Sequence, residues 1–172
     1  MAEQTRHRIQ AAIRPEVEHL TVDDLPDCLA LAADRAWPAE AHKWRLLLEV
    51  GTAYGLRDEA GELVGTTILT RYQADLAAIS MVLVAARHGR RGLGGRLMTH
   101  ALAAAGEATV FLNATEYGRP LYERLGFVPV GMTHVHAGDF TPQNGNGPAG
   151  SRPAEVADLP AIRTLDAQVN GT

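Results

Sequence analysis

Residues 82–96 read VLVAARHGRRGLGGR, an apolar strand that runs directly into a basic, glycine-rich turn and then into a helix. Four arginines fall within residues 87–96 of a chain whose formal net charge is −4, so the local charge is opposite in sign to the global charge. The first N–H groups of a helix lack partners inside the helix, and the helix dipole favours an anion beside them. Glycines at 92, 94 and 95 let a ligand approach the backbone closely. The stretch therefore predicts a turn that binds phosphate groups.

The turn differs from two common nucleotide-binding motifs. If Gly92 began a dinucleotide-binding G-x-G-x-x-G sequence, the third glycine would stand where the chain has Leu97. A P-loop would need Gly-Lys followed by Ser or Thr, which the sequence lacks. A solvated basic turn without a ligand is the alternative, and the rest of the chain has to decide between the two interpretations.

Length and composition indicate one compact domain. Of the 172 residues, 46% are hydrophobic, so most of the apolar surface can be buried in a single core. The longest apolar run, at about 77–86, is far shorter than the roughly 20 residues of a membrane span, and residues 1–15 hold no apolar signal core. We therefore expect a cytoplasmic protein that binds no membrane. The acidic balance argues against nucleic acid as a partner.

Cysteine usage excludes several kinds of site. Cys28 is the only cysteine, which rules out an internal disulfide and any metal site with several cysteine ligands. It stands among Leu25, Leu29 and Leu31 at an apolar position of an expected helix, so we predict a buried, unreactive thiol. No His spacing typical of a metal site stands out, and we expect no metal.

Predicted helices and strands alternate along the chain. Helices are expected at about 24–33, with Asp23 or Asp24 as the N-cap, and at 39–50. Strands follow at 52–57 and 63–70, joined by a hairpin loop over 58–62, and at 76–85, whose apolar sequence indicates a central strand buried on both faces. The remaining elements are a helix with Leu93, Leu97, Met98, Ala101, Leu102 and Ala105 on its apolar face, a strand at 108–114, a short helix capped by Gly126, and a strand at 128–136. This order predicts a mixed sheet with helices on both faces.

Two motifs in this order carry a family resemblance. The sequence V-x-x-x-x-x-x-R-G-L-G, which starts at Val84, is followed about 30 residues later by PLYERLGF at 120–127. Over about residues 16–137 the chain resembles the GNAT superfamily of N-acetyltransferases. The resemblance implies an α/β fold with a mixed, mostly antiparallel central sheet and helices on both faces. It also implies that the central strand splays from its neighbour and that acetyl-CoA lies in the gap.

The resemblance assigns the coenzyme contacts to particular residues. Backbone groups near Val82, Leu83 and Val84 would pair with the pantetheine arm. The pyrophosphate would lie on the turn formed by Gly89, Arg90, Arg91, Gly92, Leu93, Gly94 and Gly95. Thr115 occupies the position of a common asparagine, and its hydroxyl either caps the next helix or reaches ordered water. The chain departs from the family pattern at Gly89, where Arg or Gln is common, and at Ala86, where Pro is frequent.

The chemistry that the resemblance implies is direct attack of an amine on the thioester, which needs an acid for the leaving thiolate. Tyr122 stands at the position of that acid. A phenol with an ordinary pKa near 10 is protonated at neutral pH and can protonate a thiolate. The alternative is a packing role for Tyr122 between Leu121 and Leu125.

The general base is not evident. Ser80 lies on the central strand where many members of the family carry a glutamate. Four residues remain candidates: Asp75, Glu116, and His134 and His136, which would share a face if 128–136 is a strand. An acceptor amine of low pKa would need no base.

The sequence also does not determine which residues contact the acceptor amine. Tyr117 and Arg119 are candidates, but exposed decoration of a helix is the favoured interpretation of both. Trp37 can line the acceptor cleft, whereas Trp44 fits a core position. The favoured function is therefore acetyl transfer from acetyl-CoA to a small-molecule amine or a protein amino group. The alternative is a catalytically weak coenzyme-binding module that acts as a sensor or scaffold, which the absence of the strand carboxylate favours.

The C-terminal part repeats the start of the domain. Residues 1–137 form the expected acetyltransferase domain, and 138–153, rich in Gly, Pro, Asn and Ser, read as a linker. Beyond it, VADLPAIRTL at 156–165 resembles VDDLPDCLAL at 22–31. We interpret 154–172 as the start of a second, truncated module, with a helix that packs on the first domain as the alternative. An exposed sheet edge and a homodimer are expected.

Overall fold

The computed structural model describes residues 16–72, 74–136, 138 and 152–170. Its centre is a five-stranded sheet in the order β1-β2-β3-β4-β5, in which neighbours are antiparallel except for the parallel pair β4 and β5. The strands are β1 (Val17–Leu20), β2 (Thr52–Arg57), β3 (Leu63–Tyr72), β4 (Leu76–Val84) and β5 (Thr109–Phe111). This mixed, mostly antiparallel sheet confirms the predicted fold class.

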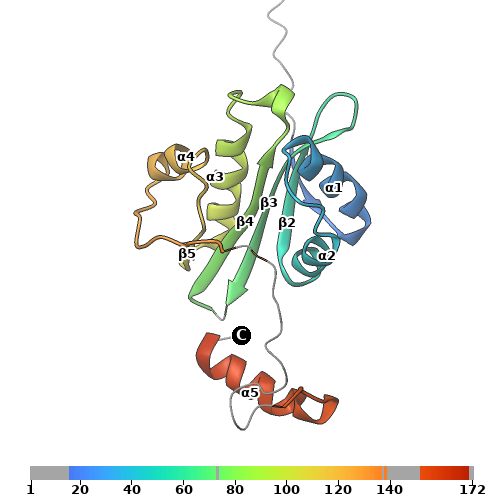
Figure 1. Cartoon of the computed structure of the whole chain (residues 1–172). Helices are drawn as coiled ribbons and strands as arrows, with labels where there is room; N and C mark the ends of the chain where they lie inside the picture. Colours follow the sequence, from blue (N-terminus) through green and yellow to red (C-terminus); the bar gives the residue numbers. More distant parts are fainter. Residues whose placement is uncertain (1–15, 73, 137, 139–151, 171–172) are drawn as a thin grey trace, which may run out of the picture.

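Helices cover both faces of the sheet (Figure 1). The α-helices are α1 (Leu25–Asp34), α2 (Ala41–Val50), α3 (Leu93–Ala105), α4 (Arg119–Arg124) and α5 (Leu159–Asn170), and short 3-10 turns precede α1, α3 and α5. Helices α1 and α2 lie on one face, and α3 lies on the other with α4 beside it. The C-terminal helix α5 lies apart from the sheet in Figure 1.

The core forms where the helix faces meet the sheet. The apolar face predicted for α3 is confirmed, because Leu93, Leu97, Met98, Ala101 and Ala105 are buried. Trp44 of α2 is also a core residue. Cys28 is fully buried, and burial together with the nearby Asp24 and Asp27 carboxylates raises the pKa of its thiol to about 12. The thiol is therefore protonated and unreactive, as predicted.

Two local predictions about strands were wrong, namely the strand at 128–136 and the length of the strand at 108–114. Residues 128–136 form no strand in the described chain. The Thr133 hydroxyl of this segment donates to Asn113 Oδ1 at 3.3 Å, two residues beyond the end of β5. Pro129 offers no N–H, and β5 spans three residues instead of the expected 108–114, so it offers little edge to pair with.

The N-terminal end of the sheet also differs from the expectation. Strand β1, which was not predicted, pairs with β2 from Val17 opposite Leu56 to Leu20 opposite Ala53. Asp24 stands at the N-cap position of α1, as predicted, but its side chain makes no capping hydrogen bond to that helix. Thr21 caps the preceding 3-10 turn, and Asp24 completes a capping box there by accepting from the Thr21 N–H. In the described part of the chain no helix is long and apolar enough to cross a membrane. The same residues contain no cluster of three potential metal ligands from His, Cys, Asp and Glu.

Candidate functional site

The sheet opens between its fourth and fifth strands. β4 and β5 pair over three positions only, from Leu76 opposite Thr109 to Ala78 opposite Phe111. Beyond Ala78, β4 continues to Val84 with no described strand on that side. The splayed pair that the sequence predicted is therefore present, and Val82, Leu83 and Val84 lie along its open edge.

A bulge in β4 lies next to this opening. The register between β3 and β4 shifts between Thr66 and Ile68, and Met81 adopts a left-handed φ of 50°. The Met81 carbonyl accepts a hydrogen bond from the Thr66 hydroxyl at 2.8 Å, in a buried position. The bulge is thereby fixed from the β3 side, and it redirects the backbone where the open edge begins.

The turn after β4 presents free backbone donors. A short 3-10 turn (Ala86–His88) follows the strand, and Arg90 and Gly92 then adopt left-handed φ values of 60° and 79° before α3 begins at Leu93. Within the described residues, no N–H from Arg90 to Gly95 donates a hydrogen bond. Successive unpaired N–H groups in a turn that leads into a helix make a concave site for anions. Phosphate binding by this turn stays a prediction.

Acidic residues from two other elements anchor the entry to the turn. Asp34, at the end of α1, accepts from the Ala86 N–H through Oδ2 at 2.7 Å. Arg87 donates to Asp58 Oδ2 at 3.1 Å and also to Glu62, and both acceptors belong to the β2–β3 hairpin. These anchors could not be predicted from the sequence, because the paired residues lie 25 or more positions apart in the chain.

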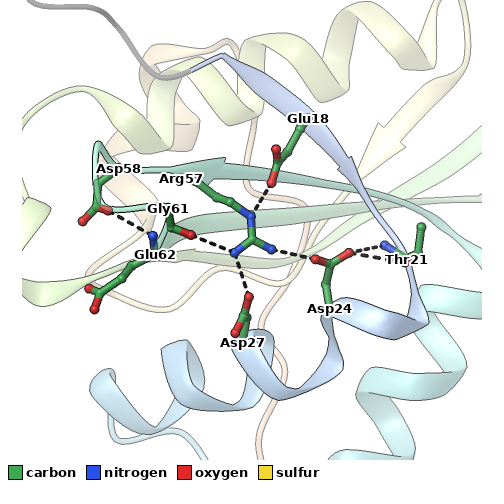
Figure 2. Close-up of polar contacts among 8 residues, drawn as sticks. All are labelled: Glu18, Thr21, Asp24, Asp27, Arg57, Asp58, Gly61 and Glu62. Atoms are coloured by element: carbon green, nitrogen blue, oxygen red, sulfur yellow. Dashed lines mark hydrogen bonds and ion pairs between the residues drawn. The ribbon is translucent and has the colours of Figure 1, made fainter.

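The same hairpin is held by a second arginine, Arg57 (Figure 2). Its guanidinium pairs with Glu18 of β1 at 2.7 Å, with Asp24 at 2.6 Å and with Asp27 of α1 at 2.7 Å. It also donates to the Gly61 carbonyl at 3.0 Å. Hydrogen bonding to Asp27, followed by the Glu18 contact, raises the pKa of Arg57 further above its ordinary range. β1, α1 and the hairpin are thus joined at one point, and the hairpin in turn holds the turn after β4.

Helix α4 closes the other side of the opening. A methyl group added at Gly94 would lie 3.3 Å from Leu121 and 3.7 Å from Val84. The start of α3, the end of β4 and α4 therefore meet at this point. Thr115 caps the turn before α4, because its hydroxyl accepts from the Gly118 N–H at 3.1 Å. The hydrogen of that hydroxyl stays available to a ligand.

Tyr122 is buried in α4, and its neighbour Leu121 packs against the start of α3. Its ring makes an edge contact with Phe127 at a centroid distance of 6.1 Å. Its hydroxyl lies over Gly118, where an added methyl group would be 3.2 Å away. Burial raises the pKa of the phenol above its ordinary value of 10.0, so the phenol carries its proton at neutral pH. The residue combines a packing role with the protonation state that a general acid needs.

On the sheet face covered by α1 and α2, two side-chain hydroxyls are buried without hydrogen-bond partners among the described residues. They are Ser80 Oγ and Thr70 Oγ1. Ser80 is opposite Ile68 and Thr70 is opposite Ala78, so the two side chains occupy diagonal positions of one face. Gly51 at the end of α2 abuts Ile68 and Thr70, which identifies this as the face that α1 and α2 cover. An unsatisfied buried hydroxyl costs about 1–3 kcal/mol, so the pair favours a water molecule or a polar ligand there.

The remaining candidates are dispersed. Asp75 and Glu116 are exposed, as are His134 and His136, which lie outside any strand and therefore do not share a strand face. Tyr117 is exposed with Arg35 over its ring, and Arg119 pairs with Glu123 at 2.6 Å. Trp37 is half-buried.

The amino-acid sequence matches a family model and two relatives. A family model described as an acetyltransferase (GNAT) domain matches residues 36–141. An uncharacterised N-acetyltransferase of Streptomyces griseus is 35% identical over 151 residues, which cover 82% of this chain and 35% of that protein. YitH, an uncharacterised N-acetyltransferase of Bacillus subtilis, is 29% identical over 124 residues, which cover 71% of this chain and 44% of YitH. The chain therefore spans less than half the length of these relatives.

Solved structures share the fold. A probable acetyltransferase of Staphylococcus aureus has a TM-score of 0.60 at 18% identity, covering 71% of this chain and 100% of that chain. A Mycobacterium tuberculosis protein solved in complex with CoA has a TM-score of 0.58 at 22% identity, covering 72% of this chain and 77% of that chain. At these identities the likeness concerns the fold alone.

Proposed function

Because the chain belongs to the GNAT acetyltransferase family, we propose that it transfers an acetyl group from acetyl-CoA to a primary amine of a small molecule or a protein. One observation carries this proposal above the others. The open edge of β4 leads directly into a turn whose N–H groups, from Arg90 to Gly95, have no partners among the described residues. Acetyl-CoA has its parts in the matching order: an extended pantetheine arm, which would pair with the strand edge, is followed by a diphosphate, which would lie on the turn.

Each predicted coenzyme contact has a role in this proposal. Val82, Leu83 and Val84 supply main-chain groups along the open edge, and Gly89 with Arg90 and Arg91 leads the chain around the phosphates. The N–H groups of Gly92, Leu93, Gly94 and Gly95 point from the helix start toward the anion. Thr115 contributes its hydroxyl hydrogen. The arginine side chains add positive charge beside backbone donors that have already been fixed by folding.

The proposed reaction is a direct displacement. The lone pair of the neutral amine attacks the thioester carbonyl, the C–N bond forms, and the C–S bond breaks as the tetrahedral intermediate collapses. The Tyr122 phenol donates its proton to the departing thiolate, and the nitrogen loses one proton, so one amide and one thiol are formed. The high pKa of Tyr122 supports this role, because the proton is present when the thiolate leaves.

The proton from the amine needs an acceptor, and β4 has no carboxylate at Ser80. The unpartnered hydroxyls of Ser80 and Thr70 support a water molecule on the face covered by α1 and α2. Such a water would connect the nitrogen to solvent. An amine that is already neutral at the working pH would need no further base.

A second candidate function is a coenzyme-binding module that acts as a sensor or scaffold. The observation that favours it is Ser80, since the site has donors for the coenzyme but no carboxylate on β4 to deprotonate the amine. Tyr122 argues for catalysis, because a binding module would not need a buried, protonated phenol.

Calorimetric titration with acetyl-CoA, followed by an amine panel assayed for thiol release, tests the proposal. We expect binding and turnover on at least one amine. Gly94→Leu should weaken binding at least 10-fold, because the new side chain would fill the space between α3 and Leu121. Ala103→Leu is the matched control, since that position is exposed on the same helix. Binding without turnover would support the sensor module, and absence of binding would reject both functions.

A further inference from the structure

The apolar side of α5 is uncovered. Every described side chain of α5 is exposed. Its apolar residues recur at helical spacing, and with Val156 just before the helix they form one stripe, made of Val156, Leu159, Ile162, Leu165 and Val169. A lone helix of 12 residues is marginal in water, so a stripe of this kind is typical of a helix that packs on a partner.

The segment that carries the stripe repeats the start of the domain in structure as well as in sequence. Residues 22–31 and 156–165 each begin with a 3-10 turn that leads into an α-helix with Pro in its first turn. Each also has a capping box, formed by Thr21 with Asp24 in the first copy and by Glu155 with Asp158 in the second. The capping aspartate accepts from an arginine in both copies.

The equivalent residues of the first copy are buried against the sheet. Leu25, Cys28 and Leu31 are 8%, 0% and 3% exposed, because α1 lies on the sheet through these residues. Their counterparts in the repeat are 44%, 45% and 61% exposed, namely Leu159, Ile162 and Leu165 in the same order. The same spacing of apolar residues therefore faces a sheet in one copy and solvent in the other.

The sheet of this domain cannot cover the stripe in the same way, because α1 and α2 already occupy that face. We propose that residues 155–170 begin a second module of the same build within a longer polypeptide, and that the sheet of that module covers the stripe. The relatives have room for such a module, since this chain spans 35% and 44% of their lengths.

The first test uses the 172-residue chain. The triple variant Leu159→Gln, Ile162→Gln, Leu165→Gln should leave the Tm within about 1 °C of the wild-type value, because these three side chains are exposed in the described part of the chain. The matched variant Leu25→Gln at the buried counterpart should lower the Tm by about 10 °C. A comparable loss in the triple variant would mean that α5 packs on its own domain, and this would overturn the proposal. A stable dimer that the triple variant abolishes would also overturn it, because the occupant would then be a second copy.

The second test uses the polypeptide read through the gene beyond Thr172. There we expect two unfolding transitions, of which the triple variant lowers only the second, by several degrees. A stop codon directly after Thr172, or a triple variant that leaves both transitions unchanged, would overturn the proposal. Acetyl-CoA binding by the first domain is measured in parallel. Its loss would count against the proposed function and not against this inference.

Discussion

Among single residues, Tyr122 has the central role in the proposed reaction, as the general acid. In the proposal its phenol is the proton donor, and its ring packs against Phe127 and lies over Gly118. We expect Tyr122→Phe to lower kcat by about 100-fold, because the thiolate loses its proton donor, with little change in acetyl-CoA affinity. Thiol release and calorimetry measure the two effects. Unchanged turnover would reduce Tyr122 to a packing residue.

The direction of the Tyr122 pKa shift sets the pH profile. Catalysis needs a neutral amine and a protonated phenol, so kcat should rise with pH until the bound amine is deprotonated. It should then stay level until Tyr122 loses its proton. Since burial raises the pKa of Tyr122 above 10.0, the falling limb should lie above pH 10 and disappear in Tyr122→Phe. A falling limb centred below pH 9 would assign the acid to another group.

Gly118 offers a separate test of how the ring is placed. A methyl group at this position would lie 2.9 Å from Tyr122 Cε2, so Gly118→Ala should push the ring out of its position. We expect a roughly 10-fold loss in kcat, with acetyl-CoA binding retained. Gly131→Ala is the control, because nothing lies within 4 Å of a methyl group there. Equal activity of the two variants would show that the ring position is unimportant.

The individual site residues were only partly predictable. The glycine turn and Tyr122 could be found because each lies inside a short motif in which neighbouring residues share one role. The anchors Asp34, Arg57 and Asp58 could not be predicted, because the role of each depends on a partner that is far away in the sequence. The capping role of Thr115, by contrast, involves the nearby Gly118, and the sequence allowed it.

At the level of elements, the turn after β4 depends on its anchorage. Asp34 accepts the Ala86 N–H, and a hydrogen bond to a charged group contributes about 1.5–3 kcal/mol. We expect Asp34→Ala to raise the KM for acetyl-CoA about 5- to 10-fold and to leave kcat within 2-fold, because the turn becomes less well fixed. Asp34→Asn keeps an acceptor and should stay close to the wild type. Steady-state kinetics with acetyl-CoA as the varied substrate would separate the two, and a similar KM for both variants would contradict the anchoring role.

The elements themselves were predicted well where local pattern determines them. The strand at 52–57 and the loop over 58–62 agree with the structure, and Gly126 has the left-handed φ of 93° expected of a helix cap. The failures, β1 and 128–136, concern strands at the edge of the expected sheet. A short edge strand forms only if a partner edge is available, and this depends on the whole fold rather than on its own residues.

For the whole molecule, charge and sheet edges matter most. The chain is acidic, yet its arginines gather at the turn that we assign to phosphate, so an anionic coenzyme would be attracted locally rather than by the net charge. Arg57 and Arg87 pair with carboxylates of β1, α1 and the β2–β3 hairpin.

Dimer formation stays a prediction at this scale. β5 is the last strand of the sheet, its outer edge has no partner among the described residues, and its Phe111 is exposed. We expect sedimentation velocity to show reversible self-association between about 1 and 100 µM, weakened by Phe111→Lys and unaffected by the triple variant of α5. A monomer at every concentration would contradict this expectation.

The short pairing of β4 with β5 has a mechanical consequence. The segment from β5 through α4 pairs with the sheet over three ladder positions only. Its other contacts with the rest of the domain include Leu121 beside Gly94, Phe111 beside Tyr72 and Tyr117 beneath Arg35. Local opening of this segment therefore costs less free energy than opening β2 or β3, which are paired along their whole length. A thioester donor lying between the two strands would touch both halves. The bound donor would then bridge β4 and β5. It would stabilise the arrangement of strands in which its acetyl group is transferred.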